Sequence, residues 1–92
     1  MDENKIIITV SGADKIGIVA SVTADLEKLK VNIEDIKQTL MQGHFVMFML
    51  CDIKNSPHSF KEIKEALVSA GEKMTMEIWV QRKEIFDNMH NI

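Results

Sequence analysis

Cysteine, proline and tyrosine are almost missing from this sequence. Its 92 residues contain one cysteine, one proline and no tyrosine. A single cysteine, Cys51, excludes both an intramolecular disulfide and a zinc site built from thiols. The longest apolar run, residues 45–51, is far shorter than the roughly 20 residues that a membrane-spanning helix requires. The polar start of the chain also predicts no signal peptide. We therefore expect a soluble, cytoplasmic protein.

Concentrated positive charge is missing as well. The formal net charge is −3, and the lysines are spread along the chain. Nucleic-acid and anionic membrane surfaces are bound by clustered basic residues. Residues 45–48 do resemble the third-strand ending of an RNA-recognition motif, but Gly43 stands where that motif stacks an aromatic residue and Met41 where it has a basic one. We expect neither nucleic acid nor membrane as a partner.

Hydrophobic periodicity predicts four strands and two long helices in one domain, residues 1–92. Strands are expected at 5–10, 33–40, 45–53 and 74–80, helices at 18–29 and 57–70, and a short helical tail within 83–92. The order βαββαβ indicates a ferredoxin-like α+β sandwich, in which an antiparallel four-stranded sheet carries two helices on one face. Gln42 and Gly43 are expected to close a hairpin.

Helix boundaries are predicted from capping residues. Asp14 is expected to cap the first helix. Ser56 is expected to cap the second, with Pro57 at its first position and Gly71 at its end.

The third strand is apolar on both faces, which is unusual for a sheet covered on one side. Phe45, Met47 and Met49 alternate with Val46 and Phe48. An exposed apolar sheet face normally marks a partner surface. Either a second subunit or the terminal helix of the same chain would then cover it.

Three stretches of the sequence resemble the ACT domain, a ligand-sensing family. Residues 8–19, Ile-Thr-Val-Ser-Gly-Ala-Asp-Lys-Ile-Gly-Ile-Val, match the strand, glycine, acidic residue and Gly-Ile helix start of its first signature. Residues 31–33, Val-Asn-Ile, match the start of its second strand. Residues 86–92 have the form Phe-x-x-Met-His-x-Ile, which ends stand-alone ACT proteins of bacteria and archaea. The resemblance implies a regulatory, non-catalytic homo-oligomer of two or more chains.

The resemblance also implies where a ligand binds. In ACT domains an amino acid commonly lies between the loop after strand one of one subunit and strand two of its neighbour. In this sequence the implied residues are Gly12, Ala13, Asp14, Lys15, Ile16 and Gly17 of the loop, with Asn32 and Ile33 of the neighbour. A helix N-terminus offers unpaired N–H groups to a carboxylate, and an asparagine amide can both donate and accept. We expect a small amino acid or a related metabolite, and no cofactor.

Several of these residues also have purely structural explanations. Asp14 can serve only as a helix cap, and Gly17 only to allow close packing. Asn32 can end the first helix in the left-handed conformation, and Lys15 can be a solvated charge. A second function therefore stays open, namely a protein-binding adaptor of the same fold that has lost ligand binding.

No group of residues in the sequence predicts catalysis or a metal site. His44, His58 and His90 have no short metal-ligand spacing, and His58 is expected in the first turn of the second helix. Cys51 is expected to be a core thiol. No nucleophile stands beside a recognisable base. We expect a protein that is not an enzyme and holds no metal.

Overall fold

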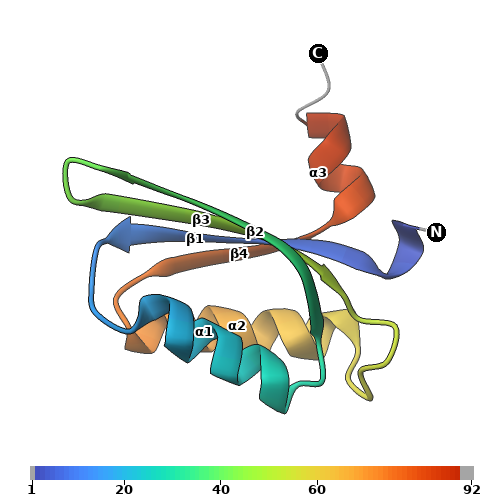
Figure 1. Ribbon diagram of the computed structural model, residues 1–92. Coiled ribbons are helices and arrows are strands. Elements are labelled where there is room, and N and C mark those ends of the chain that lie inside the picture. Colours follow the sequence, from blue (N-terminus) through green and yellow to red (C-terminus); the bar gives the residue numbers. More distant parts are fainter. Residues whose placement is uncertain (1, 90–92) are drawn as a thin grey trace.

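The computed structural model describes residues 2–89 and confirms the ferredoxin-like order, with a helix added at the C-terminal end (Figure 1). The elements are a 3-10 turn η1 (Asp2–Asn4), β1 (Lys5–Ala13), α1 (Ile18–Lys28), β2 (Asn32–Met41), β3 (His44–Asp52), α2 (Phe60–Lys73), β4 (Glu77–Arg82) and α3 (Lys83–Met89). Residues 90–92 of the predicted helical tail, including His90, lie outside the described residues.

The four strands form one antiparallel sheet in the order β2-β3-β1-β4. Figure 1 shows α1 and α2 side by side on one face of this sheet and α3 on the other. The strand order makes β2 and β4 the two edges of the sheet. Gln42 and Gly43 both have positive φ, 51° and 81°, which is the conformation of a two-residue type I′ hairpin. The predicted hairpin is confirmed.

The core lies between the sheet and the two helices. Strand β1 directs Ile6, Ile8 and Val10 into it, and all three are completely buried. Helix α1 contributes one buried apolar stripe and α2 another, as the helical spacing predicted. Each large aliphatic side chain buried in this way stabilises the fold by about 1.5–3 kcal/mol. The core holds the two edge strands and the loops at their ends in fixed positions.

Helix α1 begins differently from the prediction. Gly17 occupies the N-cap position with φ 85°, and no side chain among the described residues caps this end. Asp14 lies outside the helix, and its backbone N–H donates to the carbonyl oxygen of Gly43 at 2.9 Å. The predicted Asp14 cap is wrong because β1 continues through Ala13, which pairs with His44, and so holds Asp14 too early in the chain.

Helix α2 also begins later than predicted. Its N-cap is Ser59, whose Oγ accepts the Glu62 N–H at 3.1 Å while the Glu62 carboxylate accepts the Ser59 N–H at 2.8 Å. This reciprocal capping box satisfies two backbone donors, more than a single cap at Ser56 would. The prediction of Ser56 and Pro57 as cap and first residue is wrong. The Ser56 hydroxyl instead donates to the Leu29 carbonyl at 2.6 Å, which joins the segment before α2 to the end of α1.

Gly71 lies within α2 and does not end it. The helix continues to Lys73, and Thr75 takes the left-handed conformation with φ 59°. A Cβ atom added at Gly71 would lie 2.7 Å from Ile78 Cγ1 and 2.9 Å from the Met76 carbonyl oxygen. Glycine is therefore required here by close packing of α2 on the start of β4. The N–H groups of residues 74–76 bond back to α2, so β4 begins at Glu77 and not at residue 74.

The sheet face opposite α1 and α2 is only partly covered. Phe86 of α3 meets Phe48 of β3 edge to face, with ring centroids 6.2 Å apart. Phe48 nevertheless stays 41% exposed and Trp79 of β4 49% exposed. The terminal helix thus accounts for one part of the apolar face and leaves a second part, around Trp79, open to solvent.

Candidate functional site

The residues predicted as a ligand-binding loop divide into two groups. Gly12 and Ala13 belong to β1 and pair with β3, so only residues 14–17 form the loop. Gly12 is in close contact with the chain before β4, because an added Cβ would lie 2.6 Å from the sulfur of Met76. Gly12 and Ala13 therefore set the position of the loop, and the remaining four residues form its exposed surface.

The loop is held from two sides. Besides the bond from the Asp14 N–H to the hairpin, the Lys15 ammonium donates to the Met74 carbonyl at 2.7 Å. Ile16 directly follows these two attached residues and is completely exposed. A single exposed aliphatic side chain is ordinary on a protein surface. The exposure of Ile16 therefore shows that the loop surface is accessible and does not by itself mark a contact.

The N-terminus of α1 directly follows the loop. Its first helical hydrogen bond runs from the Ser21 N–H to the Gly17 carbonyl at 2.9 Å, so the N–H groups of residues 18–20 have no acceptor within the helix. Gly17 has a positive φ, and nothing lies within 4 Å of the position that its Cβ would take. Uncapped amides at a helix start are groups that suit a carboxylate chemically, and Gly17 has no side chain to cover them.

Asn32 and Ile33 begin β2. The left-handed residue after α1 is Lys30, with φ 62°, so the alternative of Asn32 as a left-handed helix end is wrong. Asn32 is exposed and pairs in register with Asp52. Its amide faces solvent at the edge of the sheet and is available to a ligand or a neighbouring chain.

A bulge in β2 directly follows Ile33. The pairing shifts between Ile33 and Asp35, and the Lys5 ammonium joins Glu34, the residue at the bulge, to Asp52. The N–H of Lys54, together with Lys5, holds the pKa of Asp52 below its ordinary range. This exposed ion network fixes the bulge, and with it the position of Ile33 at the edge.

The loop and Asn32 are far apart within one chain. They lie at opposite ends of α1 (Figure 1), whose 11 residues span about 16 Å. A single chain therefore does not bring the predicted site residues together. What does lie beside the loop is a hollow of about 200 Å³, lined by Asp14 together with Gln38, Thr39, Leu40 and Phe45. The sequence reasoning missed this part of β2, although its alternating apolar residues were the available signal.

The two histidines within the described residues, His44 and His58, make ordinary surface contacts. His44 Nε2 lies 3.1 Å from the Ser11 hydroxyl. His58 precedes α2, contrary to the prediction that it lies in the first turn, and its Nδ1 is 4.0 Å from Glu62 Oε1. Within residues 2–89, no three His, Cys, Asp or Glu side chains come together as metal ligands. None of the helices in that range is long and apolar enough to cross a membrane.

Cys51 is completely buried in the core, as predicted, and this burial raises the pKa of its thiol to about 12. The thiolate is the reactive form, so we expect thiol reagents to label the folded protein at pH 8 far more slowly than the unfolded chain. Between the ordinary thiol pKa and about 12, only the unfolded chain ionises, so stability should fall as the pH rises through this interval. Equal labelling rates with and without urea would contradict a buried thiol.

The fold and the loop define the class of this protein, a small ferredoxin-like domain with an uncapped, glycine-bounded helix start. The family profile of the ACT domain matches residues 4–81. The chain therefore belongs to the ACT domain family, whose members are typically regulatory modules that bind amino acids.

Relatives from bacteria support this assignment. A UPF0237 protein of Listeria innocua is 44% identical over 86 residues, covering 94% of this chain and 97% of the relative. The solved structure of an ACT domain protein from Streptococcus pneumoniae is 34% identical, with a TM-score of 0.79 and coverage of 90% and 93%. The regulatory subunit of aspartate kinase from Thermus thermophilus shares the fold, with a TM-score of 0.67 at 20% identity, over 88% of this chain and 52% of that one.

Proposed function

We propose that this protein is a cytoplasmic, non-catalytic sensor that binds a small amino acid at a site shared by two copies of the chain. The observation that carries the proposal is the placement of the predicted site residues at the two ends of α1. The loop of one chain meets the start of β2 only in a second copy, and only when that copy lies antiparallel beside the first. The shared fold with a regulatory subunit of aspartate kinase is consistent with such a function.

Antiparallel pairing of two β2 strands supplies this arrangement. Edge strand β2 offers one row of backbone N–H and C=O groups to a neighbour. When the two-fold axis passes near Gln38, residue 43 lies opposite residue 33 of the other chain. Gly43 is bonded to Asp14 of the loop, so the loop then lies beside the partner's Ile33 and the partner's Asn32.

The exposed surface is also large enough for a dimer. The chain exposes 6051 Å², whereas a compact monomer of this size exposes roughly 5400 Å². The excess of several hundred Å² approaches the roughly 800 Å² that one partner contributes to a standard interface. Ile16, Leu40 and Met41 are exposed apolar side chains at this end of the molecule, and the proposed dimer would bury them.

Each part of an amino acid then has a matching group. The amides at the start of α1 receive the carboxylate, and the absence of a side chain at Gly17 allows it to approach. The partner's Asn32 accepts from the ammonium or contacts a polar side chain of the ligand. Because the ligand contacts both copies, it binds the dimer more tightly than the monomer and shifts the equilibrium toward the dimer.

Isothermal titration calorimetry with a panel of amino acids tests this function. We expect Asn32→Ala to weaken binding of the responding amino acid about 5- to 150-fold, because the loss of a hydrogen-bond partner costs about 1–3 kcal/mol. Asn55→Ala makes the same chemical change at an exposed turn before α2 and should bind like the wild type. Absence of heat with every amino acid would refute the sensor and favour the adaptor function.

A further inference from the structure

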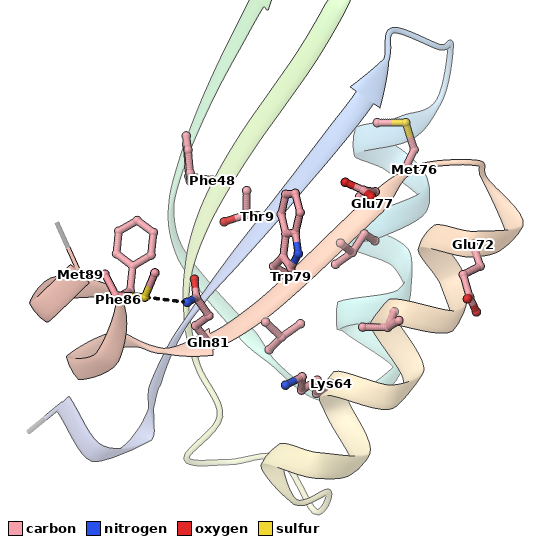
Figure 2. Close-up of a pocket in the computed structure, with 13 residues that line it drawn as sticks. Thr9, Phe48, Lys64, Glu72, Met76, Glu77, Trp79, Gln81, Phe86 and Met89 are labelled. Carbon is pink, nitrogen blue, oxygen red and sulfur yellow. Dashed lines mark hydrogen bonds between the residues drawn. The ribbon is translucent and has the colours of Figure 1, made fainter.

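The second edge of the sheet, β4, carries a groove that the proposed ligand site does not use. The groove has a volume of about 840 Å³ and follows residues 76–81. Figure 2 shows its two sides, with α2 beside the strand and Trp79 standing on the strand's exposed face. Helix α2 contributes Lys64, Val68 and Glu72. The groove thus combines an unpaired strand edge with one side of a helix.

β4 lacks two of the features that commonly protect an edge strand against pairing. The strand has neither a proline nor a bulge in its register with β1. In an antiparallel strand, every second residue directs its N–H and C=O away from the existing neighbour. Charged residues also discourage edge pairing, but those of β4, Glu77 and Arg82, lie at the two ends of the strand. Between them the exposed face presents Trp79, the only tryptophan in the chain.

The three α2 residues form a stripe that is complementary to itself. Lys64, Val68 and Glu72 are spaced four residues apart, so they lie along one side of the helix. The stripe is positive at one end, negative at the other and apolar in the middle. When it meets an antiparallel copy, lysine lies opposite glutamate at both ends and valine meets valine at the centre. The same symmetry operation makes both ion pairs.

The centres of the strand and of the stripe coincide. Gly71 packs on Ile78, and α2 runs antiparallel to β4, so Val68, about 4.5 Å earlier in the helix, lies near the level of Trp79. One two-fold axis can therefore pass by both Val68 and Trp79. Odd-numbered residues of β4 then face one another across it, with Trp79 opposite its own copy and Glu77 opposite the partner's Gln81. Gln81 donates to the sulfur of Met89, a weak acceptor, at 3.3 Å.

We propose that a second copy of this chain pairs with β4 through antiparallel strand addition, with α2 packed against α2 of the partner. Two paired β4 strands would lie about 4.8 Å apart. Because each α2 lies over the β1–β4 side of its own sheet, set back from the edge, the two α2 helices would then lie about 10 Å apart, which is an ordinary packing distance. This contact lies on the opposite edge from the ligand site and forms without ligand. Use of both edges would join protomers into an open row, since two-fold contacts at opposite edges do not close.

Charge reversal along the stripe tests the contact. Lys64→Glu and Glu72→Lys each place like charges opposite one another at both ends, so each should weaken self-association at least about tenfold at low ionic strength. The double variant Lys64→Glu/Glu72→Lys restores complementarity and should associate like the wild type. Lys28→Glu carries the same charge change at an exposed position of α1, outside the groove, and should have no effect. Sedimentation velocity over a concentration series measures all four proteins.

Tryptophan fluorescence identifies the edge that pairs. Trp79 emission should move to shorter wavelength as the wild type and the double variant associate, and should stay unchanged in the single variants. Asn32→Ala removes the proposed ligand contact and leaves β4 intact, so it should show the wild-type shift. Failure of the ligand proposal is therefore distinguishable from failure of this one. The proposal would be overturned if the single charge reversals left the strength of self-association unchanged, or if Trp79 emission stayed constant as the protein associates.

Discussion

Replacement of Gly71 by valine is expected to lower the free energy of unfolding by about 2–3 kcal/mol. The added side chain would start 2.7 Å from Ile78 Cγ1 and 2.9 Å from the Met76 carbonyl. The carbonyl belongs to the backbone and can move away only if β4 separates from α2. Overpacking of this kind typically costs about 1–3 kcal/mol, and the better helix propensity of valine offsets only a few tenths. Urea denaturation monitored by circular dichroism measures the loss.

A neighbouring position provides the control for this variant. Ser69 is exposed and lies on the same helix two residues earlier. Ser69→Val introduces the same side chain without a clash, so its unfolding midpoint should stay close to that of the wild type. A Gly71→Val protein as stable as Ser69→Val would show that α2 and β4 are not packed as closely as the distances indicate.

Gly71 also shows what the sequence could and could not predict. Periodicity predicted the order of the elements because the apolar spacing records which face is buried, and the structure confirms this for α1, α2 and β3. The end of α2 was predicted wrongly because a glycine satisfies two different needs, a left-handed turn or a close approach. Only the packing of Ile78 against Gly71, which depends on how β4 lies on α2, shows that the close approach is the reason here.

The helix starts illustrate the same limit. Ser56 and Ser59 are chemically equivalent candidates, and the choice depends on Glu62 lying three residues after Ser59 and on the Leu29 carbonyl accepting from Ser56. The first relation is local and could have been found in the sequence. The second relation joins the segment before α2 to the end of α1, and it could not have been found in the sequence.

The sequence predicted the family, and the match of the ACT profile to residues 4–81 confirms it. The ligand-binding role of the loop and Asn32 stays a prediction, and their separation along α1 follows only from the fold. The hollow lined by Gln38 and Leu40 depends on β2 running past the loop, which is a tertiary relation. The β4 groove likewise depends on α2 lying beside the strand.

Replacement of Gly17 by valine is expected to abolish most of the ligand affinity. Nothing obstructs the new side chain, because no atom lies within 4 Å of its Cβ position. The effect comes from φ 85°, which a β-branched residue avoids at a cost of about 1–3 kcal/mol. The chain can relieve this strain by rotating the backbone before α1, which turns the uncapped amides away from the carboxylate position. Calorimetry should show affinity reduced at least about tenfold, or about 1.4 kcal/mol.

Asparagine at the same position separates the conformational effect from a general loss of stability. Asn tolerates the left-handed region better than other non-glycine residues, so Gly17→Asn should keep the loop conformation and retain more affinity than Gly17→Val. Both variants should keep the far-ultraviolet spectrum of the wild type, because the strain lies before the first helical residue. If valine and asparagine weaken binding equally, side-chain bulk and not the direction of the α1 amides controls the site. If neither variant changes binding, the ligand does not contact this end of α1.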